Sequence, residues 1–316
     1  MIKYLHADKN DYDGIRSFIR DHWSFDHILV HDNDVFDHFF LDGDIPQYFL
    51  AKDESKQIIA ILGYITNRQF DGNLEYDVAW LSMWMSKKGL KEPVGILLLQ
   101  FLEKNLKVDF VGSLGVADRV IPLYERMGYI VGKMQHLIKP VPLKQKNQTF
   151  TYSISRNLLN ENELGSQIFK SELFLEKKYI SSKFYAYDEF AINKNDQKIT
   201  SIVGRTLYDT SLKRRIFRIV DFSGDINGVS IFADNISSEL FTEKIDYVDI
   251  LLSSGSCIRE GVFDLACEDN YLPLYFEPLI IEYTKKNFCY KKINYSIDDN
   301  ILIITGDCDQ ERPNYR

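Results

Sequence analysis

The sequence predicts an α/β (α+β) protein, with a mixed, mostly antiparallel central sheet flanked by helices and a second, strand-rich domain after it. Three observations support this prediction. In the first half, segments whose apolar residues have the spacing of a helix alternate with segments whose apolar residues are typical of a strand. The segment 139–148 holds two prolines and three lysines without apolar periodicity, which is typical of a linker. The 316 residues suffice for two domains of ordinary size.

The first half yields its elements in order. Helices are predicted at 10–21 and 32–40, because apolar side chains recur there every three or four residues. Two strands joined by a polar turn are predicted at 48–53 and 57–66. The remaining elements are a nearly continuous apolar strand at 76–86, a helix at 94–106 after Pro93, a strand at 109–116, a helix at 119–129 and a strand at 129–139.

The second half reads mainly as strands, with one short helix. These elements are predicted at 178–192, 198–209, 214–224 and 247–254 for the strands, and at 236–244 for the helix. We therefore expect one domain over residues 1–140 and another over 150–316.

Composition and charge exclude several classes of protein. The net charge of −8 argues against a nucleic-acid binder, which needs clustered Lys and Arg. We expect no membrane segment, because no apolar run reaches the roughly 18 residues that span a bilayer. The N-terminus carries charges where a signal peptide is apolar, and the four cysteines form no CxxC pair. These features indicate reduced thiols in a cytoplasmic protein without a bound metal.

An anion site is predicted where the strand at 76–86 leads into the helix at 94–106. First-turn amides of a helix lack intrahelical partners, and the helix dipole favours negative charge there. Lys87, Lys88 and Lys91 add positive charge in the connecting loop.

A second motif, YERMGY at 124–129, ends a helix and begins a strand. With the preceding anion site, it resembles the GNAT superfamily of acyl-CoA-dependent N-acyltransferases over roughly residues 1 to 138. The resemblance implies transfer of an acyl group from acetyl-CoA, or another acyl-CoA, to the primary amine of a small molecule. It also implies that Tyr124 donates a proton to the departing CoA thiolate, a role that suits a phenol.

The segment KGLKEPVGILLL (88–99) stands where the family has its phosphate loop, R/Q-x-x-G-x-G/A. Aligned on Gly95, Leu90 replaces the Arg or Gln and Pro93 replaces the first glycine, which removes a polar contact and an amide donor. The cofactor-binding residues implied by the resemblance are Lys88, Lys91, Val94, Gly95 and Ile96 for the pyrophosphate, and Ser82, Met83, Trp84 and Met85 for the pantetheine arm.

The general base stays open among three places. The resemblance favours a carboxylate at the start of the strand, Glu75 or Asp77. His136 on the last strand of the first half is an alternative, and the histidines His27 and His31 are another.

The stretch HWSFDHILVHDNDVFDHFF (22–40) carries four of the six histidines. His27 and His31 have the i, i+4 spacing of a metal-binding helix, but the residues between them read as extended or irregular, so we expect no metal. In the fold that the chain resembles, this segment lines the acceptor side of the cleft. The acceptor-binding residues are then Trp23, His27, His31, Phe36 and His136.

A narrower resemblance covers nearly the whole chain. The pieces FRIVDFSGD (217–225), YFEPL (275–279) and GDCDQERPN (306–314) are similar to uncharacterised bacterial proteins of surface-polysaccharide and amino-sugar pathways. This similarity implies an amino sugar, free or nucleotide-linked, as acceptor. The acidic tail at 306–314 lacks the ligand run of a calcium loop, and we expect a solvated turn or an ion-pair network there.

Two other functions compete with this one. A pseudoenzyme or binding module of a polysaccharide pathway is favoured by Pro93 and Leu90, which weaken the phosphate loop. Tandem copies of the fold also serve as transferases that use charged tRNA, but the acidic charge opposes this. The second half, which lacks both motifs, is expected to be a divergent, non-catalytic copy of the first fold. The sequence leaves oligomeric state undetermined.

Overall fold

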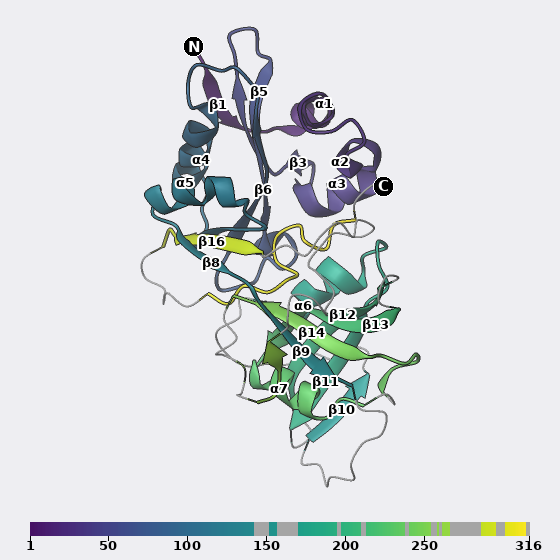
Figure 1. Ribbon diagram of the computed structural model, residues 1–316. Coiled ribbons are helices and arrows are strands. Elements are labelled where there is room, and N and C mark those ends of the chain that lie inside the picture. The colour runs from purple at the N-terminus through teal and green to yellow at the C-terminus, as the bar shows by residue number, and fades with distance from the viewer. Residues whose placement is uncertain are drawn as a thin grey trace.

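Two seven-stranded sheets form the two halves of the computed structural model (Figure 1). The structure describes residues 1–141, 152–156, 170–194, 197–209, 213–237, 240–253, 258, 261–265, 286–294 and 301–313. Most of the predicted linker, the YFEPL motif and part of the predicted helix at 236–244 lie outside these residues.

The first sheet has the order β1-β4-β5-β6-β7-β16-β8. Its strands are β1 (Lys3–His6), β4 (Tyr48–Lys52), β5 (Ile58–Thr66), β6 (Val78–Ser86), β7 (Phe110–Leu114), β16 (Asn287–Lys292) and β8 (Ile130–Lys133). All neighbours are antiparallel except β6 and β7, which are parallel. The mixed, mostly antiparallel sheet predicted from the sequence is thus confirmed.

The second sheet has the order β10-β11-β12-β13-β14-β9-β15. Its strands are β10 (Tyr152–Arg156), β11 (Asp188–Lys194), β12 (Gln197–Asp209), β13 (Arg214–Gly224), β14 (Tyr247–Leu252), β9 (Gln135–Pro140) and β15 (Asp264–Leu265). Again one pair in the middle, β13 and β14, is parallel. The second half therefore repeats the strand arrangement of the first.

The two halves exchange one strand each. β16 comes from the end of the chain and pairs with β7 and β8 of the first sheet. In return β9, from the end of the first half, pairs with β14 of the second sheet. The predicted strand at 129–139 is therefore wrong as one unit, because the chain leaves the first sheet after β8 and enters the second at β9.

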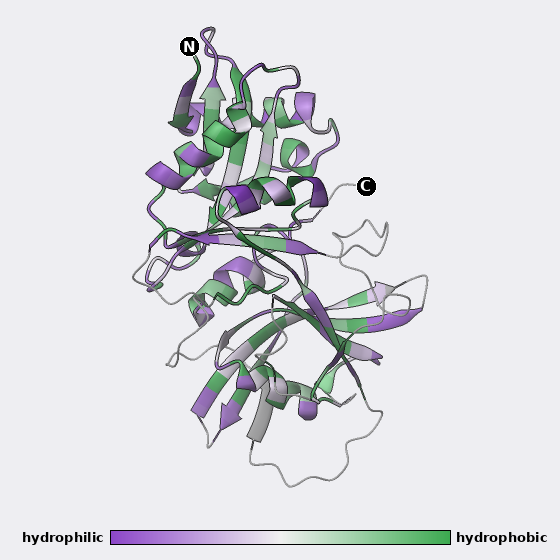
Figure 2. Cartoon of the chain, turned by 60° about the vertical axis from the view of Figure 1, so that its left-hand side comes forward, coloured by the Kyte–Doolittle hydropathy of each residue, from purple (hydrophilic) through white to green (hydrophobic). Residues whose placement is uncertain are grey.

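Helices cover both faces of the first sheet. One face carries α1 (Tyr12–His22), α2 (Ile28–His31) and α3 (Asn33–Phe40), and the other carries α4 (Val94–Asn105) and α5 (Ile121–Arg126). Asp32 caps α3, where its carboxylate accepts the amide of Val35 at 3.0 Å. Figure 2 shows the helices in both colours and the central strands largely green or white, as expected for amphipathic helices on buried sheets.

Smaller elements complete the fold. They are the strands β2 (Leu41–Asp42) and β3 (Ile45–Pro46), the short helices η1 (Lys9–Asp11), η2 (Asn67–Gln69) and η3 (Asp118–Val120), the helices α6 (Glu172–Leu175) and α7 (Asn227–Asp234), and the π-helix η4 (Glu176–Ile180). The strand predicted over 178–192 is wrong in its first part, because η4 continues to Ile180 and β11 begins at Asp188.

Candidate functional site

The parallel strands β6 and β7 separate in the middle of the first sheet. They pair over three residues, ending at Trp80 and Gly112. Gly112 is needed there, because a Cβ atom would lie 2.7 Å from the ring of Trp80. Beyond this point the second part of β6 has no ladder partner on the β7 side among the described residues. The separation leaves a gap in the sheet between the second part of β6 and the end of β7.

β6 carries a bulge beside this gap. Ser82 pairs with Gly63 and Met85 with Ile61, so two residues of β6 stand opposite one residue of β5. Met83 accordingly has a φ of 52°, which is uncommon for a residue with a side chain. Met83 packs into the core under α1–α3, whereas Trp84 packs on the α4 side. A bulge of this kind re-aims backbone and side chains, and it is common beside functional sites.

The loop before α4 places positive charge at the start of the helix. Lys88 and Lys91 are both exposed. The amide of Val94 donates to the carbonyl of Glu92 at 2.8 Å, so this predicted phosphate ligand is already engaged. Gly95 and Ile96 follow in the first turn, where amides have no intrahelical acceptor. These two amides and two lysines make up the anion site predicted from the sequence, and its binding of an anion stays a prediction.

Trp84 connects the start of α4 to Tyr124. Its indole Nε1 donates to the carbonyl of Gly95 at 3.1 Å, and a Cβ atom on Gly95 would lie 3.3 Å from Nε1. The centre of the ring system lies 5.7 Å from that of Tyr124. Trp84 therefore lies between the anion site and the phenol.

Tyr124 on α5 is buried, with 3% of its surface exposed. Burial raises the pKa of its hydroxyl well above the usual value, and the nearby Cys289 raises it further. Ser113, which hydrogen-bonds the phenol, also donates to the carbonyl of Leu81 across the gap at 3.3 Å. The phenol is therefore fully protonated at neutral pH and lies against the open edge of the sheet.

The C-terminal segment 301–313 borders the gap on the α1–α3 side. Ser82 Oγ donates to Asp309 Oδ2 at 2.8 Å, and Arg312 Nε donates to the same oxygen at 3.1 Å. Cys308 Sγ donates to the carbonyl of Leu81 at 3.3 Å. These contacts bring a buried ion pair from the end of the chain to the bulge of β6. Burial alone raises the pKa of Asp309, but Arg312 and Ser82 outweigh it and lower the pKa below the usual value.

The same segment fills the corresponding gap of the second sheet. The amide of Gly306 donates to the carbonyl of Val220 on β13 at 2.8 Å, and that of Thr305 donates to Leu251 on β14 at 3.1 Å. A Cβ atom on Gly306 would lie 2.4 Å from the hydroxyl of Tyr179. The backbone of the tail therefore joins the two strands.

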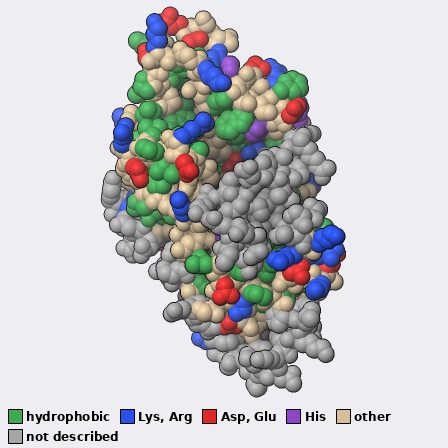
Figure 3. Space-filling view, in the orientation of Figure 1, with side chains coloured by type: hydrophobic (Ala, Val, Ile, Leu, Met, Phe, Trp, Pro, Cys, Tyr) green, Lys and Arg blue, Asp and Glu red, His purple; other side chains and the backbone are tan. Residues whose placement is uncertain are grey.

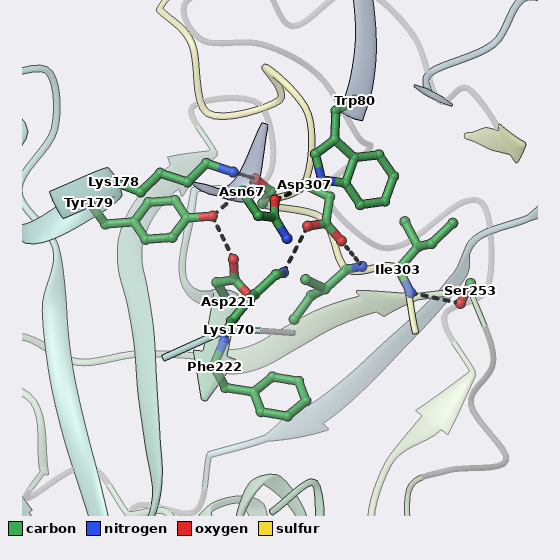
Figure 4. A network of polar contacts seen from close by, with 12 residues as sticks. Asn67, Trp80, Lys170, Lys178, Tyr179, Asp221, Phe222, Ser253, Ile303 and Asp307 are labelled. Atoms are coloured by element: carbon green, nitrogen blue, oxygen red, sulfur yellow. Dashed lines mark hydrogen bonds and ion pairs between the residues drawn. The ribbon is translucent and has the colours of Figure 1, made fainter. Parts of the chain in front are cut away.

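Buried charges hold the tail in the second gap. Figure 4 shows Lys170, Lys178 and Tyr179 converging on this part of the tail. Lys170 Nζ lies 2.7 Å from Asp221 and 2.8 Å from Asp307. Lys178 Nζ donates to the carbonyl of Gly306 at 2.8 Å. The tail is thus the buried ion-pair network, and the alternative of a solvated turn is wrong, because these partners replace water around the carboxylates.

Two histidines of the histidine segment (residues 22–40) lie in different surroundings. His27 lies near Asp309 and Arg312; burial, and then the charge of Arg312, lower its pKa to about 4. Its Nδ1 accepts the amide of Leu29 at 3.2 Å, so Nε2 carries the proton. His31 is exposed and its Nε2 donates to the carbonyl of Phe25 at 2.7 Å. The structure thus brings His27, rather than His31, to the tail.

The aromatic residues of this segment differ in their exposure to solvent. Trp23 is 49% exposed, and its ring lies 6.1 Å from that of His27. Phe36 is fully buried and stacks on Tyr48, so it belongs to the core. In Figure 3 histidine side chains reach the surface over α1–α3 beside hydrophobic and acidic ones. Trp23 and His31 are therefore the predicted acceptor residues that are exposed, whereas Phe36 is part of the core.

Three other predicted residues lie away from Tyr124. Glu75 is exposed and Asp77 is buried, both before the first residue of β6. Asp77 is five residues from Ser82, which corresponds to roughly 16 Å along an extended strand. His136 lies on β9 of the second sheet, where its Nε2 donates to Asp249 at 2.8 Å. The structure brings none of these to the gap.

Sequence reasoning missed the burial of the tail at the gap. The motif GDCDQER was noticed for its acids, but its burial depends on partners more than one hundred residues away.

Among the described residues no group of three or more His, Cys, Asp or Glu side chains is placed to hold a metal ion. No helix in that part of the chain is long and apolar enough to cross a membrane.

Solved structures share this fold. No family model and no curated protein matches the sequence. A GCN5-related N-acetyltransferase from Anabaena variabilis superposes with a TM-score of 0.60 at 11% identity, covering 93% of this chain and 73% of its own. A probable N-acyltransferase from Enterococcus faecalis gives 0.54 at 10% identity, covering 93% and 72%. A GCN5-related N-acetyltransferase from Kribbella flavida gives 0.53 at 10%, covering 93% and 71%.

These matches establish the class of fold. The chain has the fold of the GCN5-related (GNAT) N-acetyltransferases, as the sequence motifs predicted. Because the superpositions cover 93% of the chain, the likeness includes the second half as well as the first. At this level of identity the likeness concerns the fold, and the roles of individual residues are argued from their geometry.

Proposed function

We propose that the protein is an acyl-CoA-dependent N-acyltransferase acting on a small primary amine. One observation carries the proposal. The gap between β6 and β7, the bulge at Met83, the start of α4 and the phenol of Tyr124 adjoin one another in the first half. This arrangement suits a long ligand with an anionic end and a reactive end.

The residues of the first half divide the binding of acyl-CoA among them. The amides of Gly95 and Ile96 and the lysines Lys88 and Lys91 receive the pyrophosphate. The edge of β6 from Ser82 to Met85 offers backbone groups to the pantetheine amides. Val94 takes no part through its amide, which Glu92 already accepts.

The reaction needs little from the protein beyond positioning and one proton. The ammonium group first gives one proton to water. The neutral amine nitrogen then attacks the thioester carbonyl, a C–N bond forms and the C–S bond breaks. The nitrogen releases a second proton, which through water replaces the one that Tyr124 gives to the thiolate. Tyr124 donates its hydroxyl proton to the departing thiolate. Burial raises the pKa of the phenol, but a thiolate released in the same dry environment is also destabilised, so transfer to it stays favourable.

We place the acceptor on the α1–α3 side, between the histidine segment and the tail. His27 donates from Nε2 and Trp23 offers an exposed ring. A ring face and hydrogen-bond donors suit a polyhydroxylated amine. An amino sugar, free or nucleotide-linked, is the acceptor that we propose, and the narrower sequence resemblance supports it. His27 is not the base in this arrangement, because its Nδ1 lone pair already accepts an amide.

A second candidate is a binding module without transferase activity. Its support is the indole of Trp84, which packs on Gly95 and contacts Tyr124, together with Pro93 at the helix start. In that case the path from the anion site to the phenol stays closed. The same experiment separates the two functions.

That experiment is a calorimetric titration with acetyl-CoA, followed by an assay of thiol release with primary amines. The transferase predicts binding, and release that depends on the amine. Binding of an amino sugar without any binding of acetyl-CoA favours the module. No binding of acetyl-CoA or of longer acyl-CoAs rejects the transferase.

A further inference from the structure

We infer that the tail segment around Asp309 forms the subsite that receives the ammonium group of the acceptor, with Asp309 as its counter-ion. The inference rests on the proposed function and adds to it the chemistry of acceptor recognition. It assigns a binding role to a part of the chain that lies far in sequence from the motifs at 88–99 and 124–129.

Asp309 lies at the acceptor end of the gap. Its carboxylate is bound to Ser82 of the bulge, and its neighbours in sequence contact both strands: Cys308 the carbonyl of Leu81 on β6, and Gln310 Nε2 the carbonyl of Leu114 on β7 at 3.4 Å. The segment therefore spans the opening on the side opposite to Tyr124, where an amine must approach the thioester.

An unpartnered hydroxyl points to a ligand at the same place. Tyr48 is fully buried, and its hydroxyl has no hydrogen-bond partner among the described residues. Tyr48, Gly63 and Ser82 stand in one row across three strands. The phenol lies over Gly63, where a Cβ atom would be 2.9 Å from Tyr48 Cζ, so its hydroxyl reaches toward Ser82 and Asp309. A buried hydroxyl without a partner is costly unless a ligand satisfies it.

Gln310 offers a second unsatisfied oxygen. Gln310 is 6% exposed, and its side chain lies against Gly115, just after β7, with Nε2 3.6 Å from the position of a Cβ atom on that glycine. Its Oε1 has no hydrogen-bond partner in the described part of the chain. Asp309 Oδ1 receives weak contacts, from Cys308 Sγ at 3.3 Å and Gln310 Nε2 at 3.4 Å.

Three oxygens that can accept hydrogen bonds thus lie at this end of the gap, on Asp309, on its neighbour Gln310 and on Tyr48. An ammonium group carries three N–H donors and a positive charge, which matches this set. The low pKa of Asp309 keeps its carboxylate charged and makes it a weak base, so it positions the amine rather than removing its proton. Arg312 already pairs with Asp309 Oδ2, so the ammonium group meets Oδ1, which receives only weak contacts, and the neutral His27 adds no further positive charge.

The experiment measures steady-state thiol release from acetyl-CoA with D-glucosamine, phenethylamine and spermidine as amines. Asp309→Asn is expected to raise the KM for each amine that reacts by about tenfold to a hundredfold, the range for loss of a charge-assisted hydrogen bond, while the KM for acetyl-CoA stays within about twofold. Tyr48→Phe, which changes no charge, is expected to raise the amine KM by about threefold to tenfold.

Glu311→Gln is the matched control. Glu311 is as buried as Asp309 and lies in the same tail, but it pairs with Arg205 of the second half at 2.7 Å. Its replacement tests loss of a tail carboxylate without loss of the subsite, and the amine KM is expected to stay unchanged.

Other outcomes overturn the inference. An unchanged amine KM in Asp309→Asn and Tyr48→Phe, or an equal rise in Glu311→Gln, means that the tail is merely structural. If Asp309→Asn does not fold, Tyr48→Phe decides alone. Acetyl-CoA that binds while none of the three amines reacts rejects the subsite, whereas acetyl-CoA that does not bind rejects the proposed function itself.

Discussion

The two halves of the molecule have the same strand order but treat the gap between their parallel strands differently. In the first half β6 has its bulge at Met83, and in the second β13 has one extra residue, Val220, between the partners of Val203 and Gly204. At Val220 the backbone of the tail bonds to the strand, whereas at the first gap the tail makes contact through side chains. In the second half the parallel strands are therefore joined by the backbone of the tail, and in the first half they are bridged by its side chains alone.

The difference teaches that the number of sites need not equal the number of copies of the fold. A gap filled by residues 303–306 has no edge left for a second extended ligand. At the first gap the described part of the tail forms no backbone ladder, and it contacts Ser82, Leu81 and Leu114 only through side chains. We therefore expect one acyl-CoA site in each chain.

The exchange of β9 and β16 gives the largest expected effect. A fragment of residues 1–141 lacks β16, so β7 and β8 lose their shared partner and expose strand edges. We expect this fragment to aggregate when it is produced alone, and to become soluble when it is produced together with residues 142–316. Measurement of soluble yield and copurification checks this. A soluble, monomeric fragment with native circular dichroism would mean that the halves fold independently.

Gly306 tests whether the second gap must be closed. Gly306→Ala places a Cβ atom 2.4 Å from Tyr179 Oη and 2.5 Å from the carbonyl of Val220. Overpacking of this kind is expected to lower the free energy of unfolding by about 3 kcal/mol, measured by denaturant titration. Gly72→Ala is the control, because no atom lies within 4 Å of its Cβ position. Equal effects of the two substitutions would contradict the tight fit of the tail.

Asp77, the buried aspartate just before β6, is expected to change the free energy of unfolding by a similar amount, and this change depends on pH. Burial raises the pKa of Asp77 from 3.8 to about 6. The native state therefore binds this proton more tightly than the unfolded chain. The contribution of Asp77 to the free energy of unfolding is consequently highest below pH 4 and falls as the pH rises to 6. The shift corresponds to about 3 kcal/mol.

Asp77→Asn removes this pH dependence and keeps an oxygen for the amide of Arg68, which Asp77 accepts at 3.1 Å. We expect the variant to be more stable than the wild type at pH 7 and similar to it at pH 4, measured by thermal unfolding. A variant that is less stable at pH 7 would show that the charged carboxylate is needed.

Tyr124→Phe tests the proton donor that is proposed for the first half. Loss of the proton donor is expected to lower kcat by about a hundredfold and to leave the affinity for acetyl-CoA unchanged. Tyr129→Phe is the control: the ring of Tyr129 lies 4.9 Å from that of Tyr124, but its hydroxyl donates to Glu103 at 2.8 Å. Similar losses in both variants would place the effect in packing rather than in proton transfer.

The sequence predicted the local elements of the first half well, because their apolar periods are strong and their partners lie close in sequence. Two features escaped it for a physical reason. β16 is the short segment NFCYKK, whose pairing depends on β7, more than 170 residues earlier. The burial of GDCDQER depends on Lys178 and Arg205, more than one hundred residues earlier, and on Arg312 within the motif. Local composition cannot reveal whether a charge will find such a partner.

For the candidate site, the sequence motifs pointed to Tyr124 and to the start of α4, and these lie together in the structure. The general base was left open between carboxylates and histidines, and the structure separates Glu75, Asp77 and His136 from the gap. These three residues were proposed because of their places on strands, and such a place does not give the distance of a side chain from Tyr124. Their catalytic roles stay a prediction that Tyr124→Phe does not test.

The most direct test of one open gap per chain is the stoichiometry of acetyl-CoA binding measured by isothermal titration calorimetry. We predict one site per chain. Gly95→Glu, which adds a negative charge at the start of α4 and meets Trp84, is expected to abolish it. Asn227→Glu, at the exposed start of α7 in the second half, is expected to leave it unchanged. Two sites per chain, or one site that survives Gly95→Glu and is lost in Asn227→Glu, would contradict the account.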